Sequence, residues 1–334
     1  MARLTPRFGQ MNDSIAQVET VKQVSGVPGN DRRWGSSVIL PLLLATWGLM
    51  LAALNAHPLH EDEALYAAWA ILIAHGDFWL LGVPVDNPPF YLWLLTVWQS
   101  LVGAGVPALR LLNIGLSLLN SALLFALARR LAGQRTAWLA LTVYALSPFA
   151  ILFAPTLYAD VLLTTSFLAA CLAAVRRRWS WLGFCLGLGL ATKQQALLVA
   201  PLPLLLTWLI SRRPSWTRLA HGIAGLSLPL AAVLAWDTQR VALTPPGGPP
   251  DVWTQSAVSY GGLTLAPLAS WLPRLREWLA FAQYLAPGLA LSGLLLLGMG
   301  LALRHAWQRR HPRRFSTQPL WEVLVVGFAL IYLA

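Results

Sequence analysis

Ionisable side chains gather directly after the first long apolar run of the chain. The cluster comprises His57, His60, Glu61, Asp62 and Glu63. Three consecutive carboxylates repel one another, which makes them an unusual choice for simple anchoring at a membrane surface. Helix capping is the structural alternative, since an acid at a helix N-terminus accepts backbone N–H bonds and complements the helix dipole. Capping accounts for one or two acids but not for three, so the cluster favours a functional site.

Metal binding is a second chemistry open to this cluster. Imidazole and carboxylate groups are ligands that suit Zn²⁺, and His57 and His60 lie beside the acids. Their spacing, however, matches no strong metal-binding motif. We therefore expect no metal site and no required cofactor; a divalent cation would be compatible with the acids but is not indicated.

A further group of polar residues follows about 25 residues later in the same lysine-free and arginine-free segment, 57–106. Asp86 and Asn87 precede Pro88 and Pro89, and Tyr91 follows them. Asp and Asn before a proline-started helix are ordinary turn residues on their own. Because they share a segment with Asp62, we expect the two groups to contribute to one site.

Three isolated charged residues complete the candidates. Asp160 lies at the end of an apolar run, where an ionisable residue is costly and therefore functional by default. Lys193, the one lysine after residue 22, is expected to pair with a carboxylate or to bind an anion. Arg110 is a second candidate for an anion, with anchoring to lipid headgroups as the structural alternative.

The composition indicates that this protein is embedded in a membrane. Of the 334 residues, 57% are hydrophobic and only 11% are charged, whereas about a quarter of the residues of a soluble domain carry charge. We therefore predict an all-α, polytopic transmembrane bundle. The net charge of +11 does not indicate nucleic-acid binding, because the basic residues lie between apolar runs rather than on one patterned face. Cys171 and Cys185 both lie inside apolar runs, which excludes a disulfide framework.

Hydropathy predicts about nine membrane spans. They cover residues 38–56, 107–128, 137–154, 161–175, 180–192, 196–210, 219–236, 279–303 and 320–334. Residues 1–36 are predicted to form a disordered cytoplasmic tail and residues 37–334 the transmembrane domain. The first outer loop, 57–106, contains two short apolar segments, 64–74 and 90–101, that are expected to be helices lying in the membrane interface. A second outer loop is predicted at 237–278.

The basic residues decide the orientation, because Lys and Arg in short loops collect on the cytoplasmic side. With nine spans and a cytoplasmic N-terminus, 19 of the 24 basic residues lie inside, whereas most acids lie outside. If 180–210 were one span, the arginines at 176–178 and those at 212–218 would lie on opposite sides of the membrane. Two spans joined by a tight outer turn at Lys193 therefore fit better. We expect a bacterial inner-membrane protein whose active site faces outward.

The outer-loop residues resemble one enzyme family. Asp62-Glu63-Ala64-Leu65-Tyr66, then Gly76-Asp77-Phe78, then Asp86-Asn87-Pro88-Pro89-Phe90-Tyr91 are similar to the motifs of GT-C glycosyltransferases of the protein O-mannosyltransferase and aminoarabinose transferase type (family 39-like). Arg110, Asp160 and Lys193 follow in the family's order. The resemblance covers residues 38–210. The chain departs from the pattern at Asn87, where the family has lysine, and it ends inside an apolar run at Ala334, which suggests C-terminal truncation.

The resemblance implies a reaction and a set of roles. Such enzymes transfer a sugar from a polyprenyl-phosphate carrier to an acceptor hydroxyl at the outer face, usually with inversion. Asp62 would be the base, and Glu63 and Asp86 would orient the acceptor or the sugar, with Tyr66 and Tyr91 beside them. Lys193 and Arg110 would bind the lipid phosphate and Asp160 would support the acceptor side. The acceptor, a glycan, a lipid or a protein, stays open.

Two other functions are compatible with the same residues. A polytopic transporter or flippase for a lipid-linked or anionic solute would also place acids and cations in the membrane. The chain contains no internal repeat of the kind that marks many transporters, and its polar cluster lies outside the bilayer midplane. A non-catalytic membrane scaffold is the third alternative.

The distribution of basic residues yields a direct test of topology. Reporter fusions after Arg135, Arg178 and Arg213 should report a cytoplasmic location, and fusions near Asp86 and Asp251 an external one. Alkaline phosphatase and fluorescent-protein reporters, which are active on opposite sides of the membrane, provide the measurement. A cytoplasmic signal at Asp86 would contradict the outward-facing site.

Overall fold

The computed structural model describes residues 32–55, 58–211, 215–260 and 273. Within these residues every regular element is a helix, and no strand occurs. Three sets of predicted segments lie outside the described residues. They are residues 1–31 of the tail, the spans at 279–303 and 320–334, and the part of the second outer loop after residue 260, except residue 273. The chain divides into two compact units, Met1–Pro41 and Leu42–Ala334.

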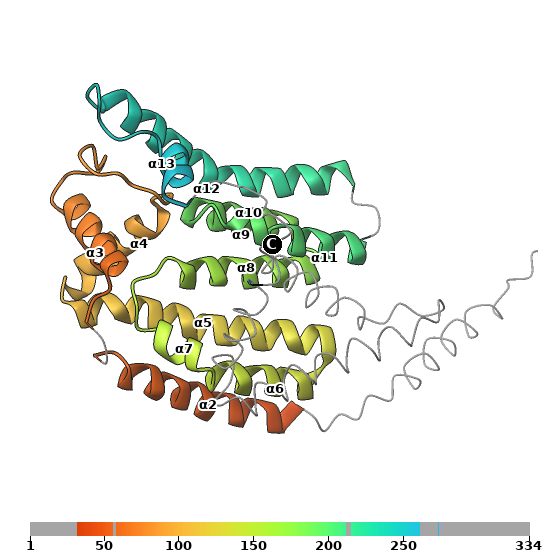
Figure 1. The fold of residues 1–334 in the computed structure, drawn as a ribbon. Helices are drawn as coiled ribbons and strands as arrows, with labels where there is room; N and C mark the ends of the chain where they lie inside the picture. Colours follow the sequence, from red (N-terminus) through yellow and green to blue (C-terminus); the bar gives the residue numbers. More distant parts are fainter. Residues whose placement is uncertain (1–31, 56–57, 212–214, 261–272, 274–334) are drawn as a thin grey trace, which may run out of the picture. The chain divides into compact units, whose positions relative to one another are not determined.

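Helices follow the predicted apolar runs closely (Figure 1). The long ones are α2 (Arg32–Ala52), α5 (Val106–Ala132), α6 (Gln134–Ala145), α8 (Asp160–Val175), α9 (Trp179–Thr192), α11 (Pro201–Ser211) and α12 (Trp216–Leu243). Shorter ones are α7 (Pro148–Phe153), α10 (Ala196–Val199) and α13 (Val252–Tyr260). Among the described helices, α5 and α12 are long and apolar enough to cross a bilayer by themselves. As predicted, the 180–210 region is interrupted by a turn around Lys193, but the predicted run 196–210 is itself divided into α10 and α11 at Ala200.

The structure corrects two helix boundaries. The predicted run 137–154 is divided into α6 and α7 at Ser147-Pro148, because proline lacks an N–H donor and disfavours helical geometry in the residue before it. The helix predicted to end at residue 236 instead continues to Leu243. Asp237 and Arg240 lower the hydropathy there, but both are buried and their side chains lie 3.7 Å apart, so the helix extends through them.

The segment 57–106, predicted to be the first outer loop, contains two helices, α3 (Glu61–Ala74) and α4 (Phe90–Val102), where its apolar segments were predicted. The Gln99 amide of α4 donates to the Ala70 carbonyl of α3 at 2.7 Å, and the Trp98 indole donates to the Ala108 carbonyl of α5 at 2.8 Å. Tyr66 and Tyr91 pack edge to face in the core beneath these helices. The loop is therefore a folded layer at the ends of the long helices (Figure 1).

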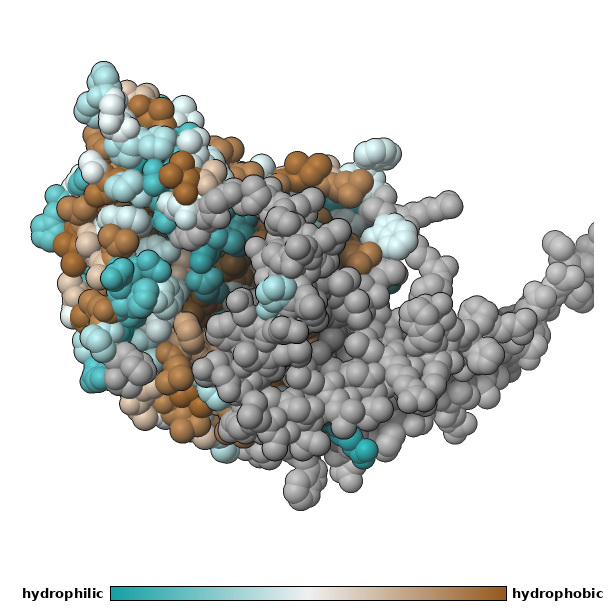
Figure 2. Space-filling view, in the orientation of Figure 1, coloured by the Kyte–Doolittle hydropathy of each residue, from teal (hydrophilic) through white to brown (hydrophobic). Residues whose placement is uncertain are grey.

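The surface differs between this layer and the long helices. In Figure 2, hydrophilic residues gather at the end that carries α3, whereas hydrophobic residues prevail along the visible edge of α12. Ile223, Leu228 and Leu234 of α12 are exposed by 66%, 67% and 45%. Such an edge suits the hydrocarbon of a bilayer, where apolar side chains need no burial in protein.

The C-terminal end of α12 is hydrogen-bonded to the loops beside it. Its Trp236 indole donates to the Phe78 carbonyl at 3.0 Å, and the buried Arg240 donates to the Val83 carbonyl at 3.1 Å and the Pro250 carbonyl at 2.8 Å. Asp237 accepts from the Val252 backbone N–H at 3.1 Å. These bonds connect the segment before Asp86 to a membrane helix, so that segment is held rather than free.

Glycines allow the backbones of α9 and α12 to come into direct contact. A Cβ atom on Gly225 would overlap the Ser180 carbonyl, and one on Gly183 would overlap the Gly222 carbonyl. Small residues commonly allow such close packing between membrane helices, where dispersion contacts stabilise the pair.

This contact predicts a position-specific loss of stability. Gly225→Ala should lower the thermal stability of the detergent-solubilised protein, because inserting a methyl group into a close contact costs about 1–3 kcal/mol. Gly115→Ala is the matched control, since a Cβ there meets nothing within 4 Å and alanine has the higher helix propensity. Equal melting temperatures for the two variants would contradict the packing.

Candidate active site

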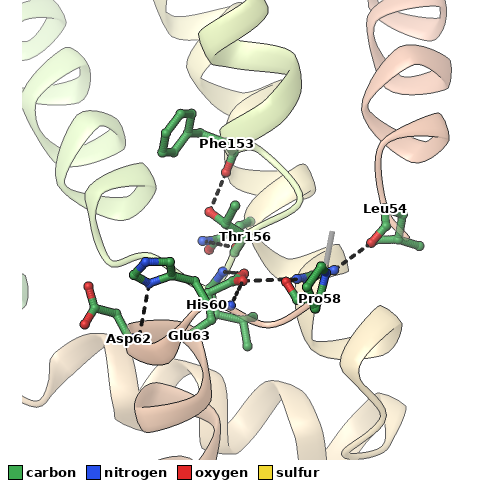
Figure 3. A network of polar contacts seen from close by, with 10 residues as sticks. Leu54, Pro58, His60, Asp62, Glu63, Phe153 and Thr156 are labelled. Carbon is green, nitrogen blue, oxygen red and sulfur yellow. Dashed lines mark hydrogen bonds and ion pairs between the residues drawn. The ribbon is translucent and has the colours of Figure 1, made fainter. Parts of the chain in front are cut away.

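The start of α3 is fixed by a capping box. His60 is the N-cap: its Nδ1 accepts the Asp62 backbone N–H at 3.3 Å, and the Glu63 carboxylate accepts the His60 backbone N–H at 3.0 Å. Capping therefore uses Glu63 and the histidine, not the Asp62 carboxylate. The Asp62 side chain points away from this network (Figure 3).

Glu63 is also half of a buried ion pair. Its Oε2 lies 3.0 Å from Arg110 Nη2, and the two side chains are 3% and 4% exposed. Glu63 Oε1 accepts the Leu157 backbone N–H at 2.8 Å. The structure thus pairs two predicted site residues with each other and places neither on the cavity described below.

Arg110 extends this network to the end of α2. It donates to the Leu54 carbonyl at 2.9 Å and to the Pro58 carbonyl at 3.1 Å (Figure 3). One ion pair from α3 and α5 therefore joins the residues after α2 to the loop before α8.

A cavity of about 520 Å³ opens beside this network. Four predicted site residues line it: Asp62, Tyr66, Asp160 and Lys193. The remaining lining includes four residues of the segment 149–158 and five polar residues from other helices and turns. The first four are Phe149, Phe153, Thr156 and Tyr158, and the polar five are Ser117, Asn120, Tyr144, Ser147 and Thr164. Its size and its mixture of aromatic and convergent polar groups are typical of a small-molecule site.

The charged residues of the cavity differ in their partners. Lys193 Nζ lies 2.9 Å from both carboxylate oxygens of Asp160. The Asp160 side chain is 57% exposed and the Lys193 side chain 15%, so solvent reaches the pair where it lines the cavity. Asp62 is exposed, and no described residue donates to its carboxylate or forms an ion pair with it. One cavity is therefore lined by an acid that has no partner among the described residues and by an ion pair whose acid is exposed.

The second predicted group reaches the cavity indirectly. Asn87 Nδ2 donates to the Tyr66 hydroxyl at 3.1 Å and to Asp86 Oδ1 at 3.0 Å. Gln194 Nε2, next to Lys193, donates to the Asp86 carbonyl at 3.3 Å. Asp86 thus lies behind the cavity wall and connects Tyr66 with the turn at Lys193.

Tyr91 lies deeper than predicted. It is buried, and its hydroxyl donates to Asn113 Oδ1 at 3.2 Å. Asn113 Nδ2 in turn donates to the Thr156 and Tyr158 carbonyls at 2.7 and 2.9 Å. Tyr91 therefore supports the loop that carries Tyr158 and does not line the cavity.

Sequence reasoning gave no role to Tyr158, which stands two residues before Asp160, and it did not single out the polar residues Ser117 and Asn120 that also line the cavity. Burial first, and then the charges of Asp62, Glu63 and Asp160, raise the pKa of the Tyr158 phenol, so it remains a hydrogen-bond donor at neutral pH. Ser117 and Asn120 sit three residues apart within an apolar helix, which places them on one face. That spacing was the available signal.

The described residues were compared with the ligand sets that a metal ion needs. Among the described residues, no group of three His, Cys, Asp or Glu side chains could hold a metal ion. His57, the other imidazole considered, lies outside the described residues.

Comparisons with known proteins agree with the motifs. Residues 86–236 match the family model of dolichyl-phosphate-mannose-protein mannosyltransferase. The chain is 26% identical over 308 residues, which are 86% of it and 54% of the relative, to the undecaprenyl phosphate-alpha-4-amino-4-deoxy-L-arabinose arabinosyl transferase of Pseudomonas paraeruginosa.

Solved structures show the same fold. ArnT from Cupriavidus metallidurans bound to undecaprenyl phosphate superposes with a TM-score of 0.65 at 18% identity, covering 89% of this chain and 55% of that one. The apo form of the same protein gives a TM-score of 0.60 at 17% identity and covers 89% and 57%. This chain spans about half the length of the relatives that it matches.

The fold is therefore that of a polytopic helical membrane protein. Because the loop motifs, the family model and the fold agree, the predicted similarity of this chain to the GT-C glycosyltransferases of the protein O-mannosyltransferase and aminoarabinose transferase type is confirmed.

Proposed function

We propose that this protein is a membrane glycosyltransferase that moves a sugar from a polyprenyl-phosphate carrier to an acceptor hydroxyl at the outer face of the membrane. One observation carries the proposal: a single cavity brings the uncommitted carboxylate of Asp62 together with the open ion pair of Asp160 and Lys193. The relatives support the donor class, since one is named for an undecaprenyl-phosphate-linked sugar and one was crystallised with undecaprenyl phosphate.

Asp62 is the general base of the proposed reaction. Its carboxylate accepts the proton of the acceptor hydroxyl while the acceptor oxygen bonds to the anomeric carbon of the sugar. The bond between that carbon and the phosphate oxygen breaks, and the lipid phosphate leaves with the electron pair. Attack opposite the leaving group inverts the anomeric centre. Exposure of Asp62 leaves it accessible to the acceptor.

Lys193 stabilises the charge on the departing phosphate. A lysine ammonium has three N–H donors, and two oxygens of Asp160 engage it here, so at least one donor remains for a ligand. Asp160 in turn holds the ammonium at the cavity and supports the acceptor side. Because Lys193 supplies positive charge at the leaving group, the proposed reaction does not call for a metal ion or another cofactor.

Glu63, Arg110, Asp86 and Tyr91 act through other residues in this proposal. The Glu63–Arg110 pair fixes the first turn of α3, where Asp62 lies. Asp86 and Asn87 hold Tyr66 and the turn at Lys193, and Tyr91 supports the loop of Tyr158 through Asn113. These four are positioning residues, whereas Asp62, Tyr66, Asp160 and Lys193 face the substrates.

The membrane arrangement belongs to the same proposal. About nine spans would place the N-terminus, with its tail 1–36, in the cytoplasm and the cavity on the outer side of the bacterial inner membrane. In this arrangement, α3 and α4 lie in the interface: Leu65 of α3 and Val97 and Leu101 of α4 expose apolar surface. The partners are the lipid-linked donor, the bilayer and an acceptor glycan, lipid or protein, without nucleic acid.

Replacing the base tests the proposal. Asp62→Asn should lower sugar transfer by about 10²–10⁴-fold, because the amide keeps the shape of the side chain but accepts no proton. Transfer is measured as the loss of radiolabel from a polyprenyl-phosphate-linked sugar. Glu61→Gln is the control: Glu61 is the adjacent exposed acid and does not line the cavity. Near-normal turnover of Asp62→Asn, or an equal loss in both variants, would contradict the role of Asp62.

Removing the cation tests donor binding separately. Lys193→Ala should weaken affinity for the lipid-linked donor at least tenfold, since a charge-assisted contact to phosphate contributes about 1.5–3 kcal/mol. Lys193→Arg should restore part of the affinity. Thermal stability should change little, because an ion pair with an exposed partner contributes at most about 1 kcal/mol. Lower stability with unchanged donor affinity would remove Lys193 from the site.

A further inference from the structure

Exposed arginines gather at the end of the long helices that lies away from α3 (Figure 1). Apolar runs separate them in the sequence, but one hydrophobic cluster packs the adjoining ends of α5, α8, α9 and α11 together, and α12 touches α9. We call this surface the basic end. Its members are Arg129 and Arg130 of α5, Arg135 of α6, Arg176, Arg177 and Arg178 between α8 and α9, and Arg218 of α12.

The acids that the structure describes lie at the opposite end of these helices. α8 begins with Asp160 at the cavity and ends beside Arg176, about 24 Å away at 1.5 Å per residue. α12 runs the other way, from Arg218 in its first turn to Asp237 near its last. The described ion pairs all lie on the acidic side, and none includes an arginine of the basic end. Within the described residues, the positive charge of the basic end is therefore unbalanced, and it attracts anions.

Helix dipoles account for only part of this surface. The arginines in the last turn of α5 and Arg176 at the C-cap of α8 lie at helix C-termini, where a cation is stabilising. Arg135, Arg178 and Arg218 lie instead at the N-termini of α6, α9 and α12, where a cation is unfavourable. The first turns of these three helices contain no acid to compensate. These three arginines therefore cost helix stability, which favours a role for their charge outside the helices.

Arg177 differs from the other members. Its φ is +56°, a left-handed conformation that favours glycine, and its Nη2 donates to the Ile210 carbonyl of α11 at 3.2 Å. Arg177 thus joins the turn after α8 to the end of α11. Because it contributes to the fold, it is not a suitable residue for testing the charge of the basic end.

Three tryptophans indicate the medium around the basic end. Trp181, Trp208 and Trp216 lie in the first turn of α9, the last turn of α11 and the first turn of α12, and each is more than half exposed. Exposed indoles are typical of the headgroup level of a bilayer, because the ring is apolar and its N–H is polar. The anions at that level are phospholipid headgroups, whose phosphate oxygens accept paired N–H bonds from a guanidinium group. A soluble partner would leave the three indoles in water.

From these observations we infer that the basic end binds the headgroups of anionic phospholipids in the leaflet opposite the cavity. The inference goes beyond the proposed function and does not depend on it. The alternative is that the arginines only direct membrane insertion. An insertion signal requires no preference of the folded protein for one lipid over another, so lipid binding distinguishes the two.

Lipid binding to the purified full chain in neutral detergent tests the inference. The probes are phosphatidylglycerol and phosphatidylcholine that carry the same fluorescent acyl chain, and fluorescence anisotropy gives their affinities. Each basic residue near anionic lipid contributes about a fivefold gain, so the parent protein should bind phosphatidylglycerol at least tenfold more tightly than phosphatidylcholine. The preference should fall as the salt concentration rises from about 0.05 M to about 0.5 M, because salt screens the charges.

Variants separate the headgroup contact from helix stability. The combined change Arg135→Gln, Arg178→Gln and Arg218→Gln should lower the preference for phosphatidylglycerol at least tenfold, while thermal stability stays equal or rises. The corresponding three lysine substitutions should keep most of the preference, since lysine also supplies positive charge to phosphate. Lys193→Ala is the matched control: it removes a cation from the cavity end and should keep the full preference.

The outcomes are distinct. Equal affinities of the parent protein for the two lipids would overturn the inference and leave insertion as the role of the arginines. An unchanged preference in the triple glutamine variant, or its loss in Lys193→Ala, would also overturn it. If the glutamine variant does not fold, the salt titration of the parent decides, because a preference that salt does not lower contradicts a charge contact. Displacement of the lipid by an equal concentration of inorganic phosphate would assign the surface to free phosphate and overturn the inference.

Discussion

The buried ion pair between Glu63 and Arg110 is the contact on which the site depends. Its two charges are shielded from water, and each is also hydrogen-bonded to backbone groups of other segments. Removing one partner of such a pair leaves an uncompensated buried charge, which costs about 3–5 kcal/mol. Because Glu63 directly follows Asp62, the pair fixes the turn of α3 that presents the base to the cavity.

The three acids Asp62, Glu63 and Asp160 therefore have different partners and different exposure to solvent. Glu63 accepts hydrogen bonds from three segments and serves the fold, whereas Asp62, one residue earlier, lines the cavity and has no partner among the residues that the structure describes. Asp160 lies between these extremes, exposed yet bound to Lys193.

Much of this could be predicted from the sequence, because hydropathy and charge act over whole segments. Most helices of the described residues, the turn that separates α9 from α10, and the joint placement of Asp62, Asp160 and Lys193 were predicted, whereas α13 was not. The pairing of Glu63 with Arg110 was not, since 47 residues separate them and both also suit a substrate.

The central claim is that chemistry, not transport, occurs at this cavity. The most direct measurement follows a sugar radiolabel on undecaprenyl phosphate in vesicles that contain the purified protein and outer-leaflet acceptors. The proposed reaction predicts that the label leaves the lipid and appears on the acceptor with inverted anomeric configuration. If the label stays on the lipid while the intact lipid-linked sugar crosses the membrane, the protein is a flippase and the proposed reaction is contradicted.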